Sequence, residues 1–142
     1  MRLLIFQLHP PVLETEGLVA ALQARLAAVE GRAGLQTSFH VEEERRLPIA
    51  IESELYWIAQ EALNNVRKHA AAQHVTVYLD FAAVAITLEV LDDGVGFDPL
   101  SVPAEGRGGL RTIAERTARV GGKLTYESTP GEGTRVKVEV TP

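Results

Sequence analysis

Residues 51–70 read IESELYWIAQEALNNVRKHA, and the apolar positions in this stretch recur at intervals of three and four. Such spacing predicts an α-helix that packs one face on a core. The residues of this face are Leu55, Ile58, Ala59, Ala62, Leu63 and Val66. Glu61, Asn65 and Lys68 fall in a stripe about 60° wide beside that face. We therefore expect these three side chains to line the rim of whatever cavity the helix covers.

Outward from this helix, the pattern alternates between further helices and strands. Residues 17–34 keep Leu18, Leu22, Leu26 and Val29 on helical spacing, and Pro10 and Pro11 are expected to end a helix formed by the first residues. Alternation of apolar and polar residues predicts strands at 35–44, 74–81, 85–93, 123–129 and 134–140, with one more helix at 110–120. This order predicts an α+β fold, a two-layer sandwich in which helices cover one face of a mixed, mostly antiparallel sheet.

Length and composition narrow the class of protein. A chain of 142 residues has the length of one domain, and 46% hydrophobic with 23% charged residues is typical of a globular protein. The net charge of −5 argues against a broad nucleic-acid surface, and no apolar run approaches the ~20 residues that cross a bilayer. The chain has no cysteine, which fits a reducing compartment. We expect a cytoplasmic protein that contacts neither nucleic acid nor membrane.

The polar stripe of the 51–70 helix is a candidate metal site. Glu61 and Asn65 are one helical turn apart, so their oxygens can face the same small ion. Mg²⁺ prefers oxygen ligands, keeps several waters and is often held by one or two protein groups together with substrate phosphates. The alternative for this segment is an ordinary solvated helix rim.

The stretch LDDGVGF, residues 91–97, leaves an apolar strand on two acids and continues through Gly94 and Gly96. Glycines at such a place allow a positive φ and let another group approach the backbone closely. A carboxylate at a strand end can accept a hydrogen bond from an exocyclic amine such as that of adenine, and it would disfavour a carbonyl there. A hairpin turn or a calcium-like loop would use the same residues.

Two more glycine-containing stretches follow. In EGRGGLRTIAER, residues 105–116, glycines lead into a helix whose first N–H groups and dipole favour phosphate, and Arg107 adds a cation. A flexible linker is the alternative there. In PGEGTRVKVEV, residues 130–140, Thr134 follows Gly133 at the start of a strand, and a simple hairpin turn is the alternative.

The four stretches in this order resemble the catalytic and ATP-binding domain of sensor histidine kinases, within the GHKL superfamily of ATPases and kinases. QEALNNVRKHA is similar to the N box, DDGVGF to the first glycine box, GRGGL to the second and GEGT to the closing motif. The resemblance covers residues 35–141 and implies the GHKL ATPase and kinase fold. Residues 1–34 resemble the end of the dimerisation and phosphotransfer hairpin, with its linker helix, in the class that works with NarL-type response regulators.

The resemblance implies roles for the N-box residues. Asn65 would coordinate a Mg²⁺ that bridges the phosphates of ATP, and Glu61 would organise the metal shell or polarise the nucleophile. Lys68 and His69 would lie near the phosphates. His9 lacks the acidic neighbour expected of a phosphoacceptor, so the accepting histidine would belong to a hairpin outside this chain.

The glycine boxes would hold the nucleotide, ATP or its product ADP. Asp92 would accept a hydrogen bond from the adenine amine, with support from Thr134 through water. Gly94 and Gly96 would let the adenine and the loop around it come close together. Gly108 and Gly109 would cradle the phosphates beside a lid over residues 98–107. The second box departs from the family's Gly-x-Gly-Leu pattern, because Arg107 stands where counting back from Leu110 would place a glycine.

The reaction implied is transfer of the ATP γ-phosphate to a histidine, with a response regulator as the indirect partner. One alternative is an anti-sigma-factor serine kinase of the same superfamily, which also carries a Glu-x-x-x-Asn helix. Another is a non-catalytic interaction module of the same fold. The lead-in LHPPVLETEGL and the KHA sequence favour the histidine kinase.

Overall fold

The structure, a computed structural model, describes residues 11–33, 35–66, 73–94, 108–129 and 133–141. The elements in these segments are α1 Pro11–Glu16, α2 Leu18–Ala33, β1 Gln36–Glu42, α3 Ile49–Asn65, β2 His74–Asp80, β3 Ile86–Asp92, α4 Gly108–Arg119, β4 Lys123–Thr129 and β5 Gly133–Val140. None of the helices in this part of the chain is long and apolar enough to cross a membrane.

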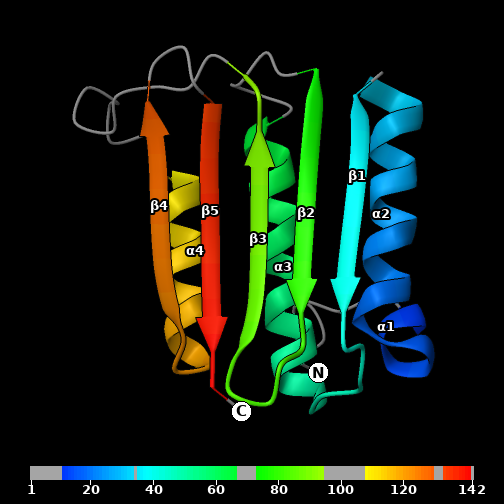
Figure 1. Cartoon of the computed structure of the whole chain (residues 1–142), viewed down its shortest axis with the longest axis vertical. Helices are drawn as coiled ribbons and strands as arrows, with labels where there is room; N and C mark the ends of the chain where they lie inside the picture. The colour runs from blue at the N-terminus through cyan, green and yellow to red at the C-terminus, as the bar shows by residue number, and fades with distance from the viewer. Residues whose placement is uncertain (1–10, 34, 67–72, 95–107, 130–132, 142) are drawn as a thin grey trace, which may run out of the picture.

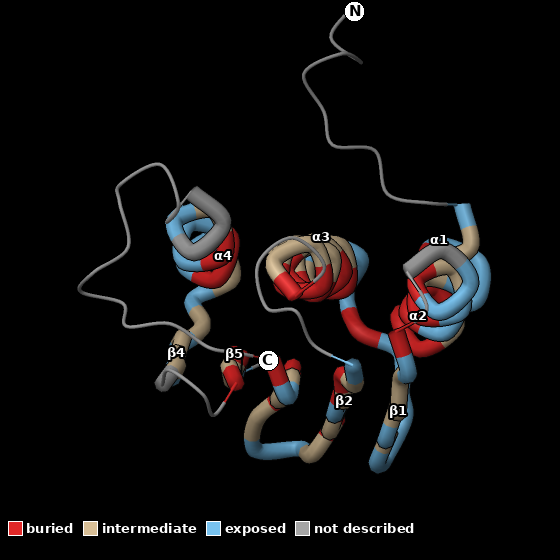
Figure 2. The backbone as a smooth tube through the Cα atoms, turned by 90° about the horizontal axis from the view of Figure 1, so that it is seen from above, coloured by how far each residue is buried: buried red, intermediate tan, exposed pale blue. Residues whose placement is uncertain are grey.

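The strands form one sheet in the order β1-β2-β3-β5-β4 (Figure 1). β1 runs parallel to β2, and the other neighbouring pairs are antiparallel. Seen from above, α2, α3 and α4 lie side by side over one face of the sheet, with α1 next to α2 (Figure 2). The predicted α+β sandwich with a mixed, mostly antiparallel sheet is confirmed.

The core lies between these two layers. Every second residue of β2 and β3 is buried toward the helices: Val75, Val77, Leu79, Ile86, Leu88 and Val90. The predicted apolar faces of α2 and α3 are also confirmed, since all of their residues named above are buried. Burial of this shared apolar surface is the main favourable contribution to folding, and it fixes which side of each strand faces the helices.

The short helix α1 was not predicted from the sequence. Pro11 begins it, because proline fits the first helical position, where no N–H partner is needed. Gly17 ends α1 with a φ of 96° and donates its N–H to the carbonyl oxygens of Val12 and Leu13. The helix expected before Pro10 lies outside the described residues. α3 begins at Ile49, directly after Pro48 and two residues earlier than predicted, and the predicted helical residues 67–70 are outside the described segments.

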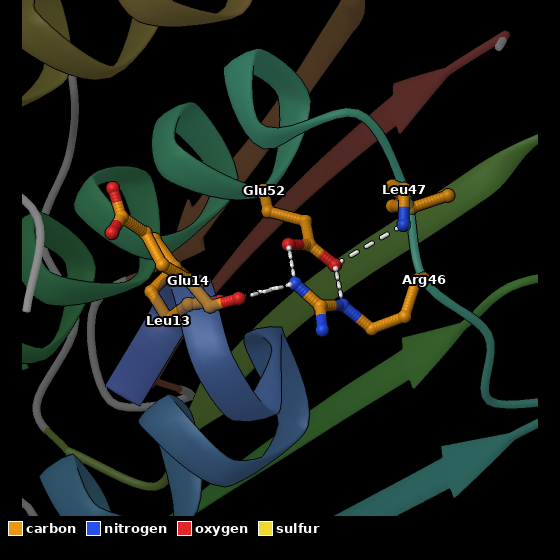
Figure 3. A network of polar contacts seen from close by, with 5 residues as sticks. All are labelled: Leu13, Glu14, Arg46, Leu47 and Glu52. Atoms are coloured by element: carbon orange, nitrogen blue, oxygen red, sulfur yellow. Dashed lines mark hydrogen bonds and ion pairs between the residues drawn. The ribbon is translucent and has the colours of Figure 1, made fainter. Parts of the chain in front are cut away.

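The loop between β1 and α3 is tied to two helices by one charged network (Figure 3). Glu52, in the first turn of α3, is fully buried and pairs through both carboxylate oxygens with Arg46, at 3.2 Å each. It also accepts the backbone N–H of Leu47 at 3.1 Å. The same guanidinium donates to the carbonyl oxygens of Leu13 and Glu14, which lie in α1. The network therefore joins α1, the loop and α3.

Candidate nucleotide-binding site

Four segments that carry predicted site residues meet at one end of the sandwich (Figure 1). α3 and β3 finish there, with Asn65 and Asp92 as their last residues. α4 and β5 begin there, at Gly108 and Gly133. The turn between β2 and β3 lies at the opposite end. The topology thus gathers into one place residues that are up to about half the chain apart in sequence.

Three polar side chains continue the buried side of the sheet at this end. Asp92, Thr134 and Ser128 are register partners on β3, β5 and β4. Val90 and Val136, each two residues away from Asp92 and Thr134 toward the middle of the sheet, are buried under the helices. Because side chains two residues apart share a face, these three residues, here called the polar row, also face the helix layer. A polar row on an otherwise apolar inner face indicates a site for a polar ligand.

The Asp92 carboxylate lies in a half-buried environment. Its Oδ1 accepts the backbone N–H of Gly94 at 2.8 Å. Burial raises the pKa of Asp92 above its ordinary value, and the neighbouring Asp93 adds to this, whereas backbone hydrogen bonds from Gly94 and Thr134 act in the other direction. An ionised carboxylate offers about four lone-pair positions, so two backbone donors leave room for an amine.

Asp93 has a different role, which the sequence reasoning did not identify. Its side chain is exposed, and Oδ1 accepts the backbone N–H groups of His74 and Gln73 at 3.0 Å each. These hydrogen bonds lower the pKa of Asp93, and the one from His74 has the largest effect. The two adjacent acids are therefore shifted in opposite directions, and only Asp92 faces the inner side of the sheet. Asp93 fastens the start of β2 to the end of β3.

Gly133 allows β5 to approach β3 at the level of the polar row. Its φ is 85°, a conformation that favours glycine, and a Cβ atom there would overlap the backbone carbonyl oxygen of Asp92. Thr134 follows directly and pairs with Asp92. Gly133 therefore sets the spacing between the two residues expected to contact the base.

Replacing Gly133 by alanine is expected to lower the free energy of unfolding by about 2 kcal/mol, from the positive φ and the overlap together. Chemical denaturation followed by circular dichroism would measure this loss. Gly31→Ala is the matched control, because a Cβ atom at Gly31 meets nothing within 4 Å and alanine favours its helix. Equal stability of the Gly133→Ala variant and the unchanged chain would contradict the expectation.

Glu61 and Asn65 lie on the last turns of α3, and both are partly exposed. Among the described residues, no group of three or more histidine, cysteine, aspartate or glutamate side chains could hold a metal ion. The two α3 side chains offer one carboxylate and one amide oxygen at the rim. This donor set fits Mg²⁺, which keeps waters and takes its remaining ligands from phosphates.

The glycines of the second box lie within α4, whereas the sequence placed them just before it. Gly108 and Gly109 are the first two residues of this 12-residue helix, and Leu110 is the third. The N–H groups of a first helical turn have no partner within the helix, so they remain suited to phosphate oxygens. Lys68, His69, Gly96, Arg107, His9 and the predicted lid over residues 98–107 lie outside the described residues.

Ser128 and Tyr126 of β4 were missed by the sequence reasoning. Ser128 Oγ lies 2.9 Å from Thr134 Oγ1. Tyr126 is partly buried, and burial, followed by the charge of Asp92, raises its pKa to about 12. The available signal was the alternation Leu124, Tyr126, Ser128, which places two hydroxyl groups after an apolar residue on one face.

Comparison with known proteins identifies the family. The family model described as "Histidine kinase-, DNA gyrase B-, and HSP90-like ATPase" matches residues 50–142. An "Uncharacterized sensor-like histidine kinase" of Chloroflexus aurantiacus is 37% identical over 99% of this chain and 25% of its own length. The sensor histidine kinase LiaS of Bacillus subtilis is 33% identical over 99% of this chain and 38% of its own length. NarS of Mycobacterium tuberculosis, also a sensor histidine kinase, is 33% identical over 99% of this chain and 33% of its own length.

Solved structures agree on the fold. The histidine kinase domain of a blue-light activated histidine kinase from Erythrobacter litoralis superposes with a TM-score of 0.68 at 23% identity, over 87% of this chain and 64% of that one. Full-length ShkA, solved in complex with AMPPNP, gives 0.68 at 21% identity, over 89% of this chain and 30% of that one.

The chain therefore belongs to the family of histidine kinase-, DNA gyrase B- and HSP90-like ATPases. It carries the ATP-binding catalytic domain found in sensor histidine kinases. It spans between about a quarter and two fifths of the length of the curated relatives it matches.

Proposed function

We propose that this chain binds ATP with Mg²⁺ at the end of the sandwich described above and donates the γ-phosphate to a histidine. The accepting histidine would belong to the dimerisation hairpin of the parent kinase, outside residues 1–142. The observation that carries the proposal is the half-buried Asp92, held in a polar row on the inner face of the sheet, at the same end as Asn65.

At the base end, Asp92 accepts a hydrogen bond from the adenine amine, and Thr134 supports it through water. Gly94 and Gly96 let the base approach the backbone. A base with a carbonyl at the position of the amine would face the carboxylate without a donor, which disfavours it by ~1–3 kcal/mol. Asp92 and Thr134 therefore act in the recognition of adenine.

At the phosphate end, Asn65 and Glu61 would hold Mg²⁺, which would neutralise charge on the phosphates of ATP. Lys68 and His69 would follow on the same stretch of chain. Gly108 and Gly109 present backbone N–H groups to phosphate oxygens, next to Arg107 and Leu110 of the second glycine box. Such transfer needs positioning and charge neutralisation more than covalent help from the protein, and a neutral imidazole already offers a lone pair to the phosphorus.

The division of the chain follows from this proposal. Residues 1–34 would be the end of the dimerisation hairpin with its linker helix, and residues 35–142 the ATP-binding domain. The lead-in sequence before α2 favours the class that works with NarL-type response regulators, so a regulator of that type would receive the phosphate in turn. The absence of cysteine and the use of ATP fit a location in the cytoplasm.

Two measurements test the proposal. Mg²⁺ and ATP at 100 times the Kd should raise the free energy of unfolding by ~2.7 kcal/mol, seen as a higher melting temperature. Radiolabelled ATP should phosphorylate a separately supplied hairpin that carries the histidine, whereas the chain alone should show at most slow hydrolysis. No thermal shift would favour a non-catalytic module. Transfer to the serine of an antagonist protein instead of the hairpin would identify a serine kinase.

Replacing Asn65 by alanine is expected to remove mainly the metal-dependent part of ATP binding. Calorimetry with Mg²⁺ should show about a tenfold weaker affinity, because one oxygen ligand is lost. With EDTA present, the variant and the unchanged chain should bind ATP alike. Asn64→Ala is the matched control, since Asn64 is the preceding residue of α3 and points about 100° away. An equal loss for both variants would refute the role of Asn65.

A further inference from the structure

The β4 strand contributes a hydroxyl pair that the proposed roles above do not use. Tyr126 pairs with Val136, and Ser128 pairs with Thr134. Val136 is buried under the helices, so Tyr126, its register partner, faces the same inner side. The Tyr126 side chain is partly buried and packs against the core cluster. A phenol thus lies directly next to the polar row, one pair further into the sandwich.

The hydroxyl groups of this region are close enough to order one another. Ser128 Oγ lies 2.9 Å from Thr134 Oγ1 and 3.4 Å from the carbonyl oxygen of Gly133, to which it donates. The side chains of Ser128 and Thr134 lower the pKa of Tyr126 against the larger effect of burial, so both hydroxyl groups lie within reach of the phenol. Because its pKa is raised to about 12, first by burial and then by the charge of Asp92, Tyr126 keeps its proton throughout the physiological range.

A threonine hydroxyl has one proton and two lone pairs, and it turns to suit its neighbours. Next to Asp92, an untethered Thr134 hydroxyl could present either its proton or a lone pair to a ligand. Neighbours that use part of its hydrogen-bonding capacity limit these orientations. The group that limits Thr134 therefore influences which edge of a base is accepted beside Asp92.

We propose that Tyr126 and Ser128 are positioning residues for base recognition: they fix the hydroxyl of Thr134 beside Asp92 and so favour a purine with an amino group over one with a carbonyl. This inference rests on the proposed binding of ATP. It adds a determinant on β4, an edge strand of the sheet, to the residues of β3 and β5.

The test is calorimetry with ATP and with inosine triphosphate, whose base has a carbonyl in place of the adenine amine. Tyr126→Phe removes one hydroxyl and keeps the ring, so ATP affinity should fall about 3- to 10-fold, the effect of one hydrogen bond. Affinity for inosine triphosphate should change little, so the ratio of ATP affinity to inosine triphosphate affinity should decrease. Ser128→Ala should also decrease this ratio.

Tyr78→Phe is the matched control. Tyr78 lies on β2 on the opposite face of the sheet, where it is 42% exposed and stacks on His40. Its loss of a hydroxyl should leave both affinities unchanged. In a Thr134→Val background, Tyr126→Phe should have no further effect on the ratio, because the hydroxyl it positions is gone.

The outcomes separate this inference from the proposed function. If the unchanged chain binds ATP and Tyr126→Phe keeps the original ratio, the positioning role is wrong while the proposed function stands. Equal weakening of both nucleotides with a lower melting temperature would show that Tyr126 only supports the fold. If the unchanged chain does not bind ATP, both proposals fail.

Discussion

Replacing Asp92 by asparagine is expected to weaken ATP binding about a hundredfold or more. The amide oxygen can still accept the N–H of Gly94, but the amide NH₂ group then faces the adenine amine, donor against donor. Loss of a charge-assisted hydrogen bond together with an unpaired buried donor corresponds to about 3 kcal/mol. Calorimetry with ATP would measure the effect, and it should appear with or without Mg²⁺.

The same substitution should not destabilise the empty protein. Burial raises the pKa of Asp92 in the folded state, so the stability that Asp92 contributes is fully present below its unfolded pKa and is lost as the pH rises through its folded pKa. At neutral pH the ionised group therefore opposes folding, and Asp92→Asn should raise the melting temperature or leave it unchanged. Asp93→Asn is the control: it should leave ATP affinity nearly intact, since Asp93 bonds to the backbone of β2.

Acidification should act like the substitution. As the pH falls through the raised pKa of Asp92, the carboxylate gains a proton and loses its charge, so ATP affinity should decrease. The Asp92→Asn variant should lack this component of the pH dependence. A carboxylate that merely closes a turn would instead leave affinity unchanged and make the asparagine variant less stable at neutral pH.

Replacing Glu52 by alanine is expected to lower the free energy of unfolding by about 3 kcal/mol. The carboxylate is fully buried, and its loss leaves a cavity, an unpaired N–H at Leu47 and a guanidinium without its partner. Arg46 is half exposed and can turn to water. The loss of stability should therefore be near the lower end of the ~3–5 kcal/mol that is typical when one partner of a buried ion pair is removed. Urea denaturation would measure it.

Two further variants distinguish the network from a general helix effect. Glu115→Ala, at an exposed position of α4, should change stability by less than about 0.5 kcal/mol. Arg46→Ala should destabilise the chain as well, because it leaves the Glu52 carboxylate buried without its cation, and it should make α1 easier to cleave by proteases. Unchanged stability of both Glu52→Ala and Arg46→Ala would show that the network does not hold α1 to α3.

Much of the fold could be predicted because its signals are local. In α2 and α3 the apolar residues repeat with the helical period over several turns. In β2 and β3 they alternate with polar residues over several residue pairs, and all of these apolar residues are buried in the structure. The short helix α1 was not predicted, because a proline can mark either a helix end or the first helical residue, and the sequence around Pro11 fits both.

The site was predictable only where a motif marked it. Asp92, Thr134 and Asn65 belong to such motifs, and the topology brings their segments to one end of the sandwich. Arg46 and Glu52 could not be paired from sequence, since their contact spans a loop of irregular backbone. The link between Tyr126, Ser128 and Thr134 depends on the register of β4 against β5, which sequence alternation alone does not set.

The turn after β2 offers a place to attach a reporter group. Val84 in this turn is 83% exposed, and seven-residue strands separate it from Asp92 by about 20 Å. Because the chain contains no cysteine, Val84→Cys would create a unique thiol for a fluorescent dye. Energy transfer between that dye and a fluorescent ATP analogue would follow occupancy in real time, from a point that does not touch the nucleotide.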